Sequence, residues 1–378
     1  MLRSKWYARP IYWIVVIALI LFLGLEGVNI AGIVSAAFAD TTNLTLASGE
    51  DYVGAVAIDD GYLYASLVTG LATVAPNVVT DPNQAIADLT ASPGKIAKVD
   101  LATFSEVATL TLAPGENAVL SLAAQGDYLY AGLATNPAKV VRIDLTSFTE
   151  NATLTLSPGE EYVGALTIIN GYLYAGLWTS PGRVVKIDLA SFTRVNTLAL
   201  PPGEQFVGAL VSQGDYLYAG LTTNPGNIMA GLPANPAKVA RIDLTNFTYS
   251  ATMTMESGEN ALLSLAIAGD SLYAGLGTYP GKVVKIDQAS FTRNATITLN
   301  FNEGYIDSLV VHNNYLYAGM IIFPGKVAQI DLGTFMQAST ISLGLDEYFI
   351  RALIIDGDFL YAGLMTAPGK IVKIDLRP

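Results

Sequence analysis

The sequence contains no cysteine and a single histidine, His312, among its 378 residues. The lack of cysteine excludes a disulfide framework, a thiolate metal site and a cysteine nucleophile. One histidine also excludes any mechanism that needs a cluster of imidazoles. Charged residues are few as well, at 14% of the chain against 52% hydrophobic residues, and this balance excludes a disordered chain.

Amphipathic helical periodicity is also missing beyond the N-terminal leader. The sequence has instead 35 glycines and 20 tyrosines, spread among short β-type segments. Tyrosine and β-branched residues favour strands, whereas Gly, Pro, Asn and Asp favour the tight turns between them. The composition therefore predicts an all-β protein built of many short strands.

The first 39 residues have the pattern of an export signal. Arg3, Lys5 and Arg9 give a positive start, and an apolar run follows from Ile11 to Leu25. The tripeptide at 37–39, Ala-Phe-Ala, then offers a small-x-small cleavage site. We expect a signal peptide at 1–39, which delivers residues 40–378 across a membrane to a secreted or cell-surface location.

An uncleaved membrane anchor is the alternative for the same segment. The apolar stretch continues past Glu26 to Ala39, long enough to span a bilayer if that carboxylate is tolerated. We expect membrane contact only through this segment. Without it, 17 basic residues face 31 acidic ones, a formal charge of −14. Such a surface repels phosphate, so we expect no nucleic-acid partner.

Internal repetition is the strongest signal in the chain. The dipeptide Ile/Val-Asp recurs with five steps of 44 residues and one of 55, and the long step carries an 11-residue insertion. Its aspartates are Asp100, Asp144, Asp188, Asp243, Asp287, Asp331 and Asp375. Seven in-phase copies are typical of a scaffold, and an Asx-type turn explains the aspartate.

Each repeat contains four β-type segments separated by turn residues. In the third unit they are Val163–Ile168, Tyr172–Leu177, Arg183–Leu189 and Val195–Leu200. Four strands in 40–45 residues predict one blade of a β-propeller, and seven repeats predict seven blades of four antiparallel strands. The chain starts on a fourth strand and stops on a third, so pairing of its two ends should close the ring without an open edge.

The repeat resembles the YVTN-type propeller family. The resemblance rests on Val-Arg-Ile-Asp-Leu at 141–145, on Ala-Thr-Leu-Thr-Leu at 152–156 and on Pro-Gly at 158–159, and it covers residues 43–378. The name-giving tetrad is replaced by Tyr-Ala-Gly-Leu, and the Trp-Asp pair of WD40 blades is missing. The resemblance implies an extracytoplasmic or surface-layer protein, often without known activity.

One acidic residue per blade falls in the loop that leads to the next innermost strand. These residues are Glu50, Glu116, Glu160, Glu204, Glu259, Glu303 and Glu347. One interpretation is structural, with each carboxylate capping local N–H groups or pairing with a base. The other is a ring around the channel mouth that attracts Ca²⁺ or a cationic ligand. Beyond this Ca²⁺ alternative, we expect neither a metal site nor a cofactor.

Departures from the repeat are better pointers to a binding site. Insertions lie within Val68–Pro93 and Pro225–Pro236, on loops of one face, and Asp81 and Asp88 are their only charges. A position filled by Gly or Leu in five innermost strands becomes Asp307 in blade 6 and Arg351 in blade 7. We expect these two to form an ion pair, with a polar patch lining the channel as the alternative.

Four N-x-Ser/Thr sequons fall at or just before outermost strands, where a glycan would reach solvent. They are Asn43, Asn151, Asn246 and Asn294. Their use depends on the host.

The sequence favours a binding or envelope structural module with a protein or glycan partner, without expected catalysis. The alternative is a lactonase-like propeller hydrolase with its site at the central channel mouth. Unlike acids and amides from several blades would be needed there, and Asp307, Glu303, Arg351 and Asn260 are the available candidates.

Overall fold

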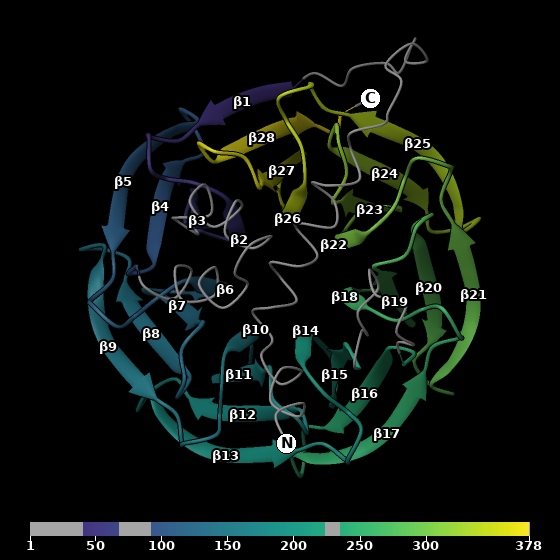
Figure 1. The fold of residues 1–378 in the computed structure, drawn as a ribbon, viewed down its shortest axis with the longest axis horizontal. Coiled ribbons are helices and arrows are strands. Elements are labelled where there is room, and N and C mark those ends of the chain that lie inside the picture. Colours follow the sequence, from purple (N-terminus) through teal and green to yellow (C-terminus); the bar gives the residue numbers. More distant parts are fainter. Residues whose placement is uncertain (1–40, 68–91, 224–234, 378) are drawn as a thin grey trace, which may run out of the picture.

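The protein, described from a computed structural model, is a ring of seven four-stranded antiparallel sheets (Figure 1). The structure describes residues 41–67, 92–223 and 235–377. Within these ranges every regular element is a strand, and none is a helix that could cross a membrane. The predicted seven-bladed propeller is therefore confirmed. The leader at 1–39, Asp81, Asp88 and most of both insertions lie outside the described residues.

Blades 1–6 each contain four strands in chain order from the centre of the ring to its rim, and blade 7 takes β1 as its outermost strand (Figure 1). The strands are, blade by blade, β2 Val53–Asp59, β3 Tyr62–Leu67, β4 Lys95–Asp100 and β5 Ser105–Thr111; β6 Val119–Gln125, β7 Tyr128–Leu133, β8 Lys139–Asp144 and β9 Thr149–Thr155; β10 Val163–Ile169, β11 Tyr172–Leu177, β12 Arg183–Asp188 and β13 Thr193–Ala199; β14 Val207–Gln213, β15 Tyr216–Leu221, β16 Lys238–Asp243 and β17 Thr248–Thr254; β18 Leu262–Ala268, β19 Ser271–Leu276, β20 Lys282–Asp287 and β21 Thr292–Thr298; β22 Ile306–His312, β23 Tyr315–Met320, β24 Lys326–Asp331 and β25 Met336–Ser342; and β26 Ile350–Asp356, β27 Phe359–Leu364, β28 Lys370–Asp375 and β1 Thr41–Thr45.

Pairing of the two chain ends closes the ring, as the sequence predicted. Strand β1 is the outermost strand of blade 7 and runs antiparallel to β28, with Thr41 opposite Ile374 and Thr45 opposite Lys370. The last sheet is therefore complete in the order β1-β28-β27-β26. Closure removes the unpaired sheet edge that an open array of blades would leave to solvent.

Neighbouring blades meet at the glycine of the Tyr-Ala-Gly-Leu segment. A Cβ placed on Gly176 in β11 would lie 2.5 Å from Cγ1 of Val207, the first residue of the next innermost strand. Gly132 faces Val163 in the same way, at 2.5 Å. Only glycine lets the branched side chain of the next blade approach this closely. In blades 2–7 the small Ala or Ser of the innermost strand lies opposite the glycine, so this close approach explains both residues.

An aromatic contact joins the blades farther out. Tyr218, almost fully buried, has its ring centroid 5.9 Å from that of Phe291 in the next blade. Arg241 lies over both the Phe291 ring and the Tyr216 ring, at 4.7 and 4.8 Å. Such stacks add to the stabilisation from buried area. The phenylalanines equivalent to Phe291 in the other blades adopt positive φ angles, between 47° and 53° with Phe291 included. This conformation is uncommon for a bulky residue, and the ring packing offsets its strain.

The contact is interrupted where the ring closes. Blade 6 carries Gln329 in place of the cation, and its side-chain amide donates to the Tyr317 hydroxyl at 3.1 Å.

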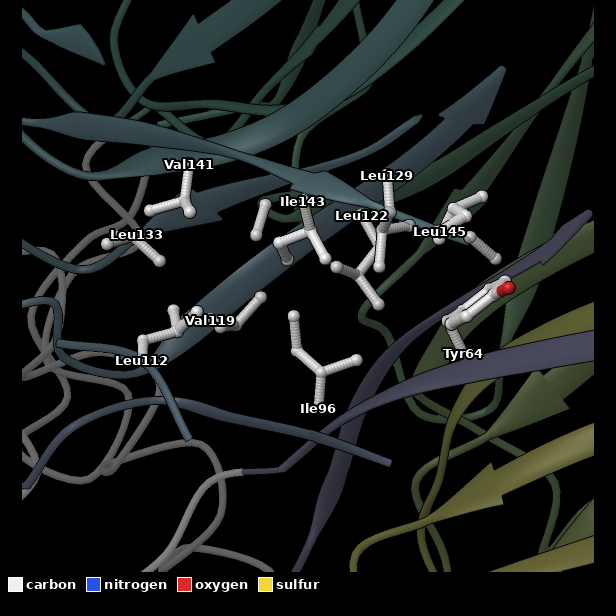
Figure 2. Packing of buried hydrophobic residues seen from close by; sticks show 12 residues of the cluster. Tyr64, Ile96, Leu112, Val119, Leu122, Leu129, Leu133, Val141, Ile143 and Leu145 are labelled. Atoms are coloured by element: carbon white, nitrogen blue, oxygen red, sulfur yellow. The ribbon is translucent and has the colours of Figure 1, made fainter. Parts of the chain in front are cut away.

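Aliphatic side chains fill the space between blades. Figure 2 shows one such cluster, in which Tyr64 and Ile96 of blade 1 face Val119, Leu129 and Ile143 of blade 2. The strands β3 and β7 carry the same burial pattern, and so do β4 and β8. Each interface repeats this packing, so the core is a set of wedges rather than one central mass.

The repeated aspartates form the expected Asx-type turns between third and fourth strands. Asp144 accepts hydrogen bonds from the Ser147 amide at 2.8 Å and from the Ser147 hydroxyl at 3.0 Å. These hydrogen bonds hold the pKa of the Asp144 carboxyl below its ordinary value. All seven aspartates therefore have a turn-forming role at the face opposite the loops discussed below.

We predict that Gly176→Ala lowers the free energy of unfolding by about 1–3 kcal/mol, the usual cost of overpacking. The matched control is Gly208→Ala, where the nearest atom to an added Cβ is Trp178 Nε1 at 3.7 Å, an ordinary contact. We expect the control to change stability by no more than about 0.5 kcal/mol. Urea denaturation followed by fluorescence measures both. Equal effects of the two substitutions would contradict the close approach of blades 3 and 4.

Candidate functional site

The seven loop glutamates are buried, and six of them contact the rim of the following blade. Each is at most 7% exposed. Glu50 accepts a hydrogen bond from the Ala47 amide at 3.1 Å and another from the Thr109 hydroxyl of the outermost strand β5 at 2.7 Å. Glu303 accepts from Thr340 at 2.7 Å and from Gln337 at 2.6 Å, both in β25. Glu116, Glu160, Glu204 and Glu259 likewise contact the outermost strand of the following blade, whereas Glu347 accepts from the Gly344 amide of its own loop at 2.9 Å.

The local environments of the glutamates differ from blade to blade. Glu259 forms ion pairs with Lys282 at 3.1 Å and Arg293 at 2.5 Å. Glu116 forms no such pair with any described residue, and its Oε1 shares the Thr153 hydroxyl with Glu150. Burial raises the pKa of Glu116, and repulsion from Glu150 adds to the effect.

These contacts support the structural interpretation of the glutamates. They give no support to a ring of carboxylates that binds Ca²⁺. Each carboxylate has its own internal contacts at a separate blade. Over the ranges that the structure describes, no group of three or more acidic, His or Cys side chains is placed to hold a metal ion. The first basic residue of each third strand mostly bonds a loop carbonyl instead, as Lys139 does with Gly115 at 3.0 Å.

Asp307 and Arg351 form the expected ion pair across the innermost strands of blades 6 and 7. Both occupy the bulge near the start of their strand, where β22 and β26 shift register. The Asp307 side chain is 1% exposed and that of Arg351 is 27% exposed. Burial raises the pKa of Asp307, and the guanidinium of Arg351 opposes that rise. Among the described residues, Asp307 Oδ1 has no hydrogen-bond partner.

The hydrolase candidates divide between the centre and the rim. Glu303 is held at the rim by β25, whereas Asp307 is held at the innermost strands by Arg351. A carboxylate pair that could act together on one bond is therefore not formed by these two residues. Within the part of the chain that the structure describes, the acids proposed for the lactonase-like alternative are not assembled at this mouth.

Trp178 is a site residue that sequence reasoning missed. It lies just after β11 and against Gly164, where a Cβ would meet its Nε1 at 1.9 Å. Gly164 occupies the bulge position of β10, equivalent to Asp307 and Arg351 in blades 6 and 7. The indole therefore covers the bulge positions of blades 3 and 4. An alignment of the repeats could have revealed it, because the same position is small or aliphatic in Ala134, Thr222 and Gly277.

Aromatic residues gather on one face of blades 5–7. This loop face carries the connections from second to third strand and from each outermost strand to the next blade. Six residues on it are called here the aromatic patch: Tyr279, Phe301 and Phe323 are exposed, Tyr305 and Tyr348 are half-buried, and Phe349 is buried beneath them.

The patch consists of two ring clusters. Tyr279 lies 6.1 Å from Phe301 and 5.8 Å from Tyr305 between ring centroids. Tyr348 lies 5.8 Å from Phe323 and 5.1 Å from Phe349. Phe349 packs with Ile321 and Met365, and Tyr305 and Tyr348 border this group, so the two clusters are continuous.

The exposure of the patch is unusual for this repeat. Phe301 is 77% exposed and stands where other blades carry Ser48, Pro114 or Pro158. Leu345, 64% exposed, takes the same position in the next loop. The other large exposed apolar side chains lie on outermost strands, one each on β5, β13, β17 and β25. Gathered apolar surface of this kind marks interaction sites more often than scattered residues do.

The two insertions belong to the same face. They leave the ends of β3 and β15 and return at β4 and β16, on the loop side. Asp81 and Asp88, the charges predicted to mark the first insertion, lie outside the described residues. The four sequon asparagines, Asn43, Asn151, Asn246 and Asn294, are all exposed, three on outermost strands and Asn246 in a turn before one.

We predict that two equivalent loop glutamates respond oppositely to neutralisation. Glu259→Gln should cost about 2–3 kcal/mol at pH 7, because Lys282 and Arg293 lose their charged partner. Glu116→Gln should be neutral or stabilising at pH 7. Its raised pKa means that the folded protein binds the proton more tightly than the unfolded chain. The free energy of unfolding of the wild type therefore falls as the pH rises above the ordinary pKa of a glutamate carboxyl.

Urea denaturation of both variants at pH 7 and pH 4 measures the contrast. The benefit of Glu116→Gln should shrink at pH 4, where the wild-type carboxyl is already protonated. A loss at pH 7 as large as that of Glu259→Gln would contradict the different environments described for the two blades.

Solved structures include chains of the same architecture. A chain of the crystal structure of the mitotic checkpoint complex aligns with TM-score 0.67 and 14% identity, over 93% of this chain and 96% of that one. The WD40 repeats of RRP9 align with TM-score 0.65 and 15% identity, over 89% and 97%. The computationally designed protein Ika8 aligns with TM-score 0.55 and 11% identity, over 88% and 98%.

No protein-family model and no curated protein matches the chain. At 11–15% identity the structural likeness establishes the fold alone. The chain is a seven-bladed β-propeller with WD40-like structural neighbours.

Proposed function

We propose that this protein is an exported propeller that binds a partner through its loop face and acts as an interaction module or envelope component. The aromatic patch is the observation that carries the proposal. Aromatic side chains are enriched at recognition surfaces because they bury a large area and lose little conformational entropy. A rigid ring can present such a patch without rearrangement on binding.

Export is supported by the leader, whose positive start and apolar run directly precede the ring. We further propose that the repeat is of the YVTN type, on the motif at 141–159 described above. That assignment places the protein outside the cytoplasm, secreted or attached to the cell surface. One structural neighbour is a chain of a multiprotein assembly, which agrees with a role for this fold in binding.

The partner is a component of the cell envelope, protein or glycan. The acidic chain, with a net charge of −12, disfavours nucleic acid and anionic lipid. The patch contains no cation of its own and offers flat apolar rings edged by tyrosine hydroxyls. Such a surface suits a partner that is neutral and partly apolar.

We predict that Phe301→Ser combined with Phe323→Ser weakens binding to isolated envelope fractions by about tenfold or more, because anchoring aromatics carry much of a binding energy. The matched control combines Val195→Ser with Met336→Ser, two exposed side chains at the rim. Co-sedimentation of the purified full-length protein with the envelope measures the difference.

Location is tested on the producing cells themselves. Protease added to intact cells should cleave the protein, or the protein should be recovered from the medium. Recovery from the cytoplasm alone would overturn the proposal, as would equal envelope binding by the patch variant and the rim control.

A further inference from the structure

We propose that the loop face binds a neutral carbohydrate, with Asp307 and Arg351 bonding adjacent hydroxyl groups and the aromatic patch packing against the sugar rings. This inference rests on the proposed function, in which the loop face is the binding face. It names the chemical class of the partner and the polar residues that would recognise it.

The ion pair is a costly departure from the repeat. A buried carboxylate loses its hydration, and replacing a buried pair with apolar residues is often neutral or stabilising. Five of the seven blades need no pair at this position, since they carry Gly54, Leu120, Gly164, Gly208 and Leu263. The fold therefore does not require Asp307 and Arg351, and a ligand contact accounts for them better.

The pair also has unused hydrogen-bonding capacity. Asp307 engages Arg351 through Oδ2, while Oδ1 has no partner within the described part of the chain. The Arg351 guanidinium has five N–H bonds that can donate, and it contacts Asp307 through the Nη1 nitrogen. A buried acceptor left unpaired destabilises the folded state, so a bound donor at Oδ1 would recover stability.

Two hydroxyl groups on neighbouring carbons match this arrangement. One hydroxyl donates to Asp307 Oδ1, and the other accepts from an N–H of Arg351. A hydroxyl is small enough to reach Oδ1 when the partly exposed Arg351 side chain rotates. Asp307 repels anions and Arg351 repels cations, so the pair selects a neutral polar group.

Two residues of the aromatic patch are close in sequence to the ion pair. Tyr305 precedes Asp307 by two residues and Phe349 precedes Arg351 by two, at the same two junctions between loop and innermost strand. Sugar rings have C–H faces that pack on aromatic rings and hydroxyl edges that form hydrogen bonds. Aromatic walls with a few placed polar groups are the usual lining of a small-ligand site. Trp178, over the bulges of blades 3 and 4, gives a further ring at the innermost strands.

The probe set is five neutral oligosaccharides: maltopentaose, cellopentaose, laminaripentaose, xylopentaose and chitopentaose. Isothermal titration calorimetry with the full-length protein should detect binding of at least one. The test variant is Asp307→Leu with Arg351→Leu, since blades 2 and 5 already carry leucine at this position and the fold should be retained. Loss of both hydrogen-bonding groups should weaken binding by about tenfold or more. The rim control, Val195→Ser with Met336→Ser, should bind as the wild type does.

Three outcomes overturn the inference: no binding of any of the five sugars, unchanged affinity of the leucine variant, or envelope binding that survives periodate oxidation of the envelope glycans. The last result assigns the loop face to a protein partner and leaves the proposed function intact. Envelope binding left unchanged by Phe301→Ser with Phe323→Ser would instead refute the proposed function itself. The two failures are therefore distinguishable.

Discussion

The ring depends on one repeated contact, in which a branched side chain from an innermost strand fits against a glycine of the preceding blade at six of the seven interfaces. The contact fixes how closely two sheets approach, and Gly176 with Val207 is a typical example. Blade 1 carries Ser66 at the glycine position, fully buried, with its hydroxyl accepting from the Ala55 amide at 2.8 Å. Because each blade contacts only its neighbours, the wedge angle set by this contact helps to decide how many blades close a circle.

Much of the fold was predictable because the repeat encodes it seven times. Third-unit strand limits agree with the sequence prediction to within two residues, and the β1–β28 closure follows from where the repeat starts and stops. The Asp307–Arg351 pair was predictable too, since equivalent positions of adjacent blades must be neighbours. Periodicity gives such relations without any knowledge of side-chain geometry.

The direction of a loop side chain was harder to predict. The sequence located the glutamates correctly in their loops but could not tell whether they faced the channel or the rim. Hydrogen bonds to threonines about 37 to 59 residues away, such as Thr153 and Thr109, decide this. Phe301 and Trp178 were overlooked for another reason. Each is conspicuous only when set beside its counterparts in other blades, none of which is aromatic.

The position of β1 gives the ring a defined polarity relative to whatever precedes it in the chain. Thr41 pairs with Ile374, next to the Asp375 turn, so the polypeptide enters the ring at its aspartate-turn edge, opposite the loops. If the leader stays in a bilayer, the acidic turns face the lipid and the aromatic residues point outward. The protein would then be held at the membrane by one face of the ring while the opposite face, with the aromatic patch, stays free to bind a partner.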